Sequence, residues 1–219
     1  MAIDLYKFYI VQPQAGRNYV TNPHPYAATT GYKNYNGSMA LDDTYTRRGS
    51  SCLKITPQTN IASGVFYSTV SVTSGLAYAF SVDVKGVAGQ AMRIYIANVS
   101  GTAKATTTFT ATGYWQRVAV THTAAENAST YRAYVVRDAV ASTDPFYVDG
   151  AQFEQASAAS TFFDGYTPGC HWTGTIRNST SARSDNTGLG GELIDLSTYC
   201  EIVSVSGLGH GDWNQILTK

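Results

Sequence analysis

The sequence has few charged residues and few of the residues that build surface helices. Only 14% of its 219 residues are Asp, Glu, Lys or Arg, against roughly 25% in an average soluble protein. Leucine, glutamate and lysine number only 9, 4 and 6, although they are strong helix formers. The strand-forming residues are abundant instead, with 27 Thr, 17 Val and 16 Tyr. This composition excludes an all-helical protein.

Other absences narrow the class of function. The formal net charge is zero and the 15 Lys and Arg residues are scattered along the sequence, so we do not expect general binding of nucleic acid. No stretch reaches 18 consecutive apolar residues, which excludes a transmembrane helix. Asp4 and Lys7 interrupt the apolar core that a signal peptide needs, so we expect a protein that stays in its cell or leaves by lysis. Cys52, Cys170 and Cys200 lack C-x-x-C spacing, which favours buried thiols over disulfides or a zinc site.

Alternating apolar and polar residues predict a series of antiparallel strands, clearest in 78–85 and 92–97. Eight or nine short strands fit an all-β fold, an antiparallel β-sandwich of the jelly-roll type. The expected strands are 52–56, 64–72, 78–86, 92–100, 106–111, 115–123, 130–138 and 146–154. The alternation predicts a core of Tyr78, Phe80, Val82, Val84, Ile94, Ile96, Val118, Val120, Val135 and Val148. Trp115 begins its strand and is expected to be largely buried.

The chain divides into four parts by composition. Residues 1–16 form an N-terminal strand or arm, and 17–157 form the sandwich, with 17–50 expected as a structured loop with one short strand at its start. Residues 158–190 are rich in Gly, Ser, Thr and Asn and predict an extended linker. Residues 191–219 return to strand-like composition but are too few for a core of their own. They predict the start of an incomplete second β domain.

The sequence contains no motif that indicates an enzyme. It has no P-loop, no G-x-S-x-G and no H-E-x-x-H. Some carboxylates can always be paired as in a glycosidase, and the candidates are Asp42, Asp43, Asp83, Asp149 and Glu154. Nothing in their spacing favours that role, so we expect a protein without catalytic residues. His122 lies in phase with strand residues 118 and 120, which predicts a hydrogen-bonded core histidine.

Tyrosine and tryptophan exceed what a small core requires. The C–H face of a sugar packs on an aromatic ring while polar side chains bind its hydroxyl groups. Some of these residues lie opposite the predicted core, and others lie in the expected loop. The candidate sugar-binding residues are Tyr32, Asn34, Tyr35, Arg93, Tyr95, Arg132 and Tyr134. The alternative is that the tyrosines pack against other protein subunits, where tyrosine is also enriched.

Five segments carry a resemblance to a known family: NYVTNPHPYAATTGY at 18–32, GSSCLKIT, YAFSVDVKG, YWQRVAVTHTA and FYVDGAQFE. Together they resemble the carbohydrate-binding modules of the CBM4/9/22 type, over roughly residues 18–155. It implies a jelly roll that binds glycans and requires no cofactor for activity. It also implies a structural Ca²⁺ held by Asp149, although Gly150 stands where the family has a second aspartate.

A second resemblance concerns TFFDGYTPGCHWTGTIRNSTSARS at 161–184. This segment is similar to a junction in tail proteins of long-tailed bacteriophages, and GGELIDL at 190–196 resembles the domain opening that follows it there. The resemblance implies a structural component of a phage tail tip or baseplate, assembled in the host cytoplasm and resident in the virion. Its partners would be other tail proteins and host-surface glycans, in a trimer or hexamer. The alternative is a module of a secreted glycan-degrading enzyme.

Overall fold

The computed structural model describes residues 9–11, 15–26, 28–125, 130–183, 193–195, 200–201 and 217–218. Contacts divide the chain into two units, residues 16–183 and a second unit formed from 1–15 and 184–219. In the second unit, β1 (Tyr9–Val11) pairs antiparallel with β15 (Leu193–Asp195), and β16 (Cys200–Glu201) pairs with β17 (Leu217–Thr218). Most of the segment expected to begin a second domain, 191–219, lies outside the described residues. Within the described part of the chain, no helix is long and apolar enough to span a membrane.

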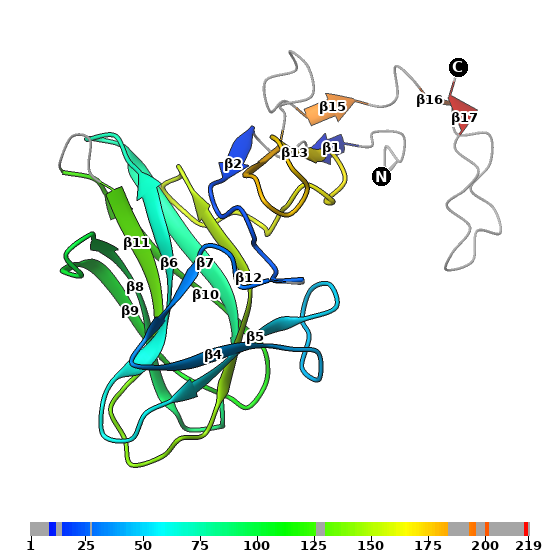
Figure 1. Ribbon diagram of the computed structural model, residues 1–219. Coiled ribbons are helices and arrows are strands. Elements are labelled where there is room, and N and C mark those ends of the chain that lie inside the picture. The colour runs from blue at the N-terminus through cyan, green and yellow to red at the C-terminus, as the bar shows by residue number, and fades with distance from the viewer. Residues whose placement is uncertain are drawn as a thin grey trace, which may run out of the picture. The chain divides into compact units, whose positions relative to one another are not determined.

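Residues 16–183 form two five-stranded antiparallel sheets (Figure 1). The β7 sheet has the order β10 (Gln116–Thr123), β7 (Ala77–Lys85), β12 (Phe146–Glu154), β5 (Cys52–Pro57) and β4 (Gly37–Asp42). The β11 sheet has the order β3 (Tyr32–Tyr35), β6 (Ser63–Ser71), β11 (Thr130–Arg137), β8 (Ala91–Asn98) and β9 (Ala103–Thr110). The predicted all-β sandwich of jelly-roll type is confirmed.

The main core lies between the inner faces of the two sheets. Alternation along β7 directs Phe80 and Val82 inward, and on β8 it directs Ile94 and Ile96 to the same core. All the predicted core residues are buried except Val118, which is only partly buried on the edge strand β10. The remaining predicted members are Tyr78, Val84, Val120, Val135 and Val148.

The individual predictions for Trp115, His122 and the three cysteines have mixed outcomes. Trp115 is only half-buried, less than expected, because it precedes the first residue of β10. His122 is half-buried and its Nε2 lies 3.2 Å from the Tyr131 hydroxyl, which agrees with a hydrogen-bonded histidine. Cys52 is buried and Cys170 is half-exposed, and neither forms a disulfide. The side chain of Cys200 is outside the described residues.

The expected loop over 17–50 contains two further strands, β3 and β4. The chain passes from one sheet to the other at Asn36, which lies between these strands and has a φ of +49°. Asparagine tolerates this left-handed conformation better than most residues. Its side-chain amide donates a hydrogen bond to the carbonyl of Ala62 at 3.0 Å. The turn-forming residues that predicted a loop therefore mark a corner between two sheets.

The segment after β12 folds back onto the sandwich. β13 (Cys170–Trp172) pairs with β14 (Ser181–Arg183), and β14 pairs with β2 (Gly16–Asn18). This arrangement differs from the extended linker expected over 158–190, of which 184–190 lie outside the described residues. The pairing joins segments more than 160 residues apart, so local periodicity could not reveal it.

Candidate functional site

Aromatic side chains from three strands form a row on the outer face of the β11 sheet. Phe66 on β6 lies opposite Tyr134 on β11, and Tyr134 lies opposite Tyr95 on β8. Their neighbours Val135 and Ile94 are buried in the main core. Successive side chains of a strand point to opposite faces. The three rings therefore project away from the core, where they belong to a separate apolar cluster.

The three rings stack on one another. The Tyr95 and Tyr134 centroids are 4.5 Å apart with an interplanar angle of 6°, and those of Phe66 and Tyr134 are 4.9 Å apart at 25°. Tyr134 lies between the other two, so both faces of its ring are covered and it is only 3% exposed. Tyr95 is 8% exposed. These two tyrosines form the base of the surface: both faces of the Tyr134 ring and one face of the Tyr95 ring are covered by other rings.

Tyr35 completes this surface from the edge strand β3. Its ring meets Tyr134 edge-on, with centroids 5.7 Å apart and planes at 87°. Burial first, and then the neighbouring tyrosines, raise the pKa of Tyr95, so its hydroxyl stays protonated. Gly64 lies opposite Tyr35 on β6, and a Cβ there would overlap the carbonyl oxygen of Val135. Tyr35 remains half-exposed.

Two arginines lie beside the aromatic row. The guanidinium of Arg132 is 5.1 Å from the centroid of Phe66, and that of Arg93 is 6.0 Å from the centroid of Tyr95. Arg93 also pairs with Asp138 at 3.4 Å. The Nε atoms of both arginines are buried and have no hydrogen-bond partner among the residues that the structure describes. We call this surface the aromatic face, and it consists of Tyr35, Phe66, Arg93, Tyr95, Arg132 and Tyr134.

The structure separates two predicted residues from this face. Tyr32 is 5% exposed in the main core, where its hydroxyl donates to the carbonyl of Asn22 and its ring meets Tyr67 edge-on. The expectation that Tyr32 binds from a loop was therefore wrong. Asn34 is exposed, but it lies opposite Val65, which faces the core, so it is not on the aromatic face.

Two residues on the outer face of the β11 sheet, Lys33 and Phe66, were not among the predicted sugar-binding residues. Lys33 lies opposite Phe66 in the register of β3 and β6, and it is exposed. The sequence carried a signal for Phe66, because its neighbours Val65 and Tyr67 continue the inward pattern of that strand. No comparable signal marked Lys33, since β3 itself was not predicted.

The donors around Asp149 do not fit the structural Ca²⁺ that the resemblance implied. Asp149 Oδ2 accepts hydrogen bonds from the backbone N–H groups of Arg47 and Arg48 at 3.1 and 2.6 Å, and Oδ1 accepts one from Gly150 at 2.7 Å. Burial raises the pKa of Asp149 to about 6, although these hydrogen bonds oppose the rise. Among the described residues, no group of three or more His, Cys, Asp or Glu side chains could hold a metal ion. The carboxylate instead holds the loop before β5.

The outer face of the β7 sheet is covered by the chain itself. Arg48 Nε and Arg117 Nη1 donate to Asp83 Oδ2 at 2.7 and 3.3 Å. Phe162 lies under both guanidinium groups, 4.1 and 5.4 Å from its ring centroid. Three of the carboxylates considered for catalysis, Asp83, Asp149 and Glu154, are at most 4% exposed.

The other two candidate carboxylates, Asp42 and Asp43, are less buried than these three and lie at the end of β4 and just after it. Asp42 is half-buried and its Oδ1 accepts hydrogen bonds from the backbone of Thr44 and Tyr45. It therefore stabilises the turn after β4. Asp43 is exposed within that turn.

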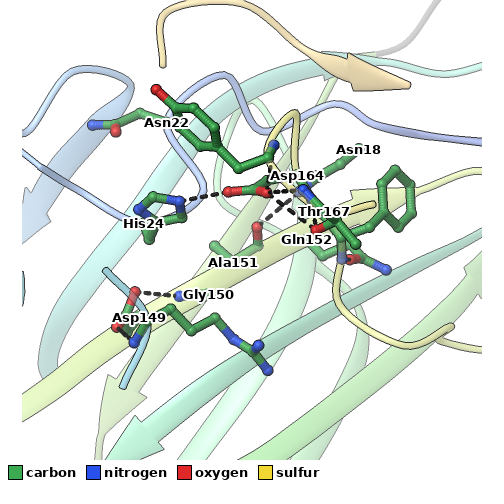
Figure 2. Close-up of polar contacts among 12 residues, drawn as sticks. Asn18, Asn22, His24, Asp149, Gly150, Ala151, Gln152, Asp164 and Thr167 are labelled. Carbon is green, nitrogen blue, oxygen red and sulfur yellow. Dashed lines mark hydrogen bonds and ion pairs between the residues drawn. The ribbon is translucent and has the colours of Figure 1, made fainter. Parts of the chain in front are cut away.

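The F-D-G-x-T-P segment forms a turn fastened to the loop after β2. Asp164 Oδ1 accepts hydrogen bonds from the backbone of Tyr166 and Thr167, and Oδ2 lies 2.5 Å from His24 Nε2 (Figure 2). Burial alone would raise the pKa of Asp164, but the hydrogen bonds and the charge of His24 outweigh it and lower the pKa. Trp172 packs against Gly165, where no side chain would fit. This motif is structural within the described unit.

Comparison with known proteins agrees with the sandwich. The family model described as carbohydrate binding domain (CBM_4_9) matches residues 19–140. No match is found among the curated proteins. Among solved structures, the CBM22-1 xylan-binding domain of Paenibacillus barcinonensis Xyn10C superposes with a TM-score of 0.50 at 17% identity, covering 67% of this chain and 99% of that one.

Two longer proteins contain a similar fold. The arabinose-bound MgGH51 α-L-arabinofuranosidase has a TM-score of 0.51 at 12% identity, over 63% of this chain and 26% of that chain. Tailspike protein 4 of bacteriophage CBA120 has a TM-score of 0.50 at 9% identity, over 62% of this chain and 21% of that chain. The chain thus spans only about a quarter or less of these two proteins. At such identities the likeness concerns the fold alone.

Proposed function

Because the chain belongs to the carbohydrate-binding domain family, we propose that its aromatic face binds a glycan. The single observation that supports this assignment is the row of Phe66, Tyr134 and Tyr95 on the outer side of the β11 sheet. A row of aromatic side chains that faces away from the core has no role in closing the sandwich. The outer face of the other sheet, by contrast, is covered by Phe162 and its two arginines.

The residues of the aromatic face have three roles in the proposed binding: apolar contact, hydrogen-bond donation and positioning. Tyr35 and Phe66 are half-exposed and offer apolar surface to the C–H face of a sugar ring. Arg93 and Arg132 are half-exposed and supply guanidinium N–H donors to its oxygen atoms. Tyr95 and Tyr134 act as positioning residues beneath them. A surface of this kind binds weakly, on the order of 1 mM or about −4 kcal/mol, and several copies acting together raise the avidity.

Binding to a broad glycan array tests this function. We expect the intact chain to retain at least one glycan, and Tyr35→Ala or Phe66→Ala to reduce retention at least tenfold. Tyr114→Ala is the matched control, because Tyr114 is 78% exposed and lies outside the aromatic face. If the wild type retains no glycan, or all four proteins bind alike, the aromatic face is a packing surface for other subunits.

We further propose that this module is carried by a structural protein of a phage tail tip or baseplate, located in the virion and assembled in the host cytoplasm. The F-D-G-x-T-P…W-T-G segment at 163–174 supports this setting. Its partners would be other tail proteins, in a trimer or hexamer, and host-surface glycans. A module of a secreted glycan-degrading enzyme fits the family match equally well. We assign no reaction to the described residues.

The two settings differ in where the protein is found. Antibodies against the chain should detect it in tailed particles purified by density gradient, and light scattering should give a mass of three or six chains. Detection only in the soluble fraction, together with glycan-degrading activity, would support the enzyme module instead.

A further inference from the structure

The two sheets carry opposite balances of charge. The strands of the β11 sheet contain no Asp or Glu in their described ranges, whereas those of the β7 sheet contain Asp42, Asp83, Asp149 and Glu154. The β11 sheet nevertheless contains five cationic residues: Lys33, Arg93, Lys104, Arg132 and Arg137. Since the whole chain has no net charge, positive charge is concentrated on this sheet.

Three of these cations lie on its outer side. Lys33 is opposite Phe66, Arg93 is opposite Val136, and Arg132 is next to Tyr134 in the alternation of β11. Arg93 is paired with Asp138, an exposed contact in which both side chains are about two-fifths accessible. Lys33 and Arg132 form no ion pair with any residue that the structure describes. The face therefore keeps a surplus of positive charge.

The guanidinium groups are held in place by the aromatic side chains. Arg132 lies over the ring of Phe66, and Arg93 lies near that of Tyr95. A cation over a ring face is attracted to it, which restricts the rotation of the long side chain. Although the Nε–H groups are buried, both arginine side chains remain half-exposed, and a planar guanidinium matches the two oxygen atoms of a carboxylate or phosphate. The surface thus combines apolar rings with anion-binding groups a few ångströms away.

We propose that the aromatic face binds an acidic glycan, whose sugar rings carry carboxylate or phosphate groups. This inference rests on the proposed function, because it names the ligand of the same surface. The sugar ring packs on Tyr35 and on the part of Phe66 that Tyr134 and Arg132 leave exposed. The anionic substituent is held by Arg132 and Lys33, and Arg93 supplies a third cation whose exposed pair with Asp138 is exchangeable.

Binding of the intact chain to three soluble polymers tests the inference by affinity electrophoresis and calorimetry. Polygalacturonate carries carboxylates, phosphomannan carries phosphates, and β-1,4-galactan is neutral. We expect at least one acidic polymer to bind tenfold or more tightly than the galactan. We expect that binding to weaken at least tenfold between 50 and 500 mM NaCl. Which acidic polymer binds then distinguishes carboxylate from phosphate recognition.

Two variants and one control test whether the cations of the aromatic face and its edge bind the anionic group. Arg132→Gln should weaken binding of the acidic polymer about tenfold, and Lys33→Gln, at an exposed position, should weaken it severalfold without affecting folding. Lys54→Gln changes a cation of the β7 sheet and should leave binding unchanged. Equal binding of neutral and acidic polymers, or binding insensitive to salt, would overturn this inference and leave the proposed function standing. Binding to no polymer and no array glycan would overturn both.

Discussion

His24 and Asp164 are 140 residues apart in the sequence, yet His24 Nε2 lies 2.5 Å from Asp164 Oδ2, and both side chains are buried (Figure 2). The lowered pKa of Asp164 keeps it ionised at neutral pH, so His24 donates this hydrogen bond. The contact joins the turn at Asp164, which precedes β13, to the loop that follows β2. The segment that resembles a phage junction is thereby part of the folded unit.

The contact between His24 and Asp164 predicts that the two side chains are coupled in their contributions to the free energy of unfolding. Asp164→Ala should lower the free energy of unfolding by about 3–5 kcal/mol, because it leaves His24 and two backbone N–H groups without an acceptor. A double-mutant cycle with His24→Ala, measured by urea unfolding, should give a coupling energy of about 1–3 kcal/mol. Additive single effects would show that the two side chains do not stabilise one another.

Removing the buried ring of Tyr134 should lower the free energy of unfolding more than removing its hydroxyl group alone. Tyr134→Ala should destabilise the unit by about 3–5 kcal/mol, because it leaves a cavity between Tyr95 and Phe66. Tyr134→Phe keeps the stacked ring and should cost less than about 1.5 kcal/mol. Chemical denaturation of both variants checks this. Equal losses would mean that the hydroxyl, and not the stack, stabilises the aromatic face.

Gly64 is predicted to be intolerant of any side chain. Its Cβ would overlap the carbonyl oxygen of Val135, so Gly64→Ala must displace β6 from β11. We expect a loss of about 2 kcal/mol or more and weaker glycan binding, since Tyr35 lies opposite this residue. Gly16→Ala is the control, because its Cβ meets only ordinary contacts. A fully stable Gly64→Ala protein would contradict the close approach of these strands.

Asp149 predicts an unusual dependence of stability on pH. Its pKa is raised from 3.8 to about 6 in the folded protein, so between these values the folded state binds the proton more tightly than the unfolded state. This group therefore contributes stability as the pH falls from 7 to 4, up to about 3 kcal/mol. The free energy of unfolding of the wild type, minus that of Asp149→Asn, should increase over this interval. A difference that stays constant with pH would contradict the raised pKa.

The sequence alone determined the strands β5 to β12 of the sandwich and the sides on which their residues lie. Alternation is a local property with a period of two, so it assigned Phe80 and Ile94 to the core. It also placed Tyr95 and Tyr134 together on an outward face. The same pattern would have added Phe66. The family resemblance and the composition agreed with this all-β fold.

Only the tertiary structure decided which of those side chains meet. The stack of Tyr95 on Tyr134 depends on the register of β8 against β11. Tyr35 contacts Tyr134 from β3, a strand that was not predicted because turn-forming residues surround it. Tyr32, three residues before Tyr35, is buried against Tyr67 instead. Strand order and register arise from contacts between distant segments, which minimise exposed apolar surface over the whole unit. No local pattern in the sequence records that choice.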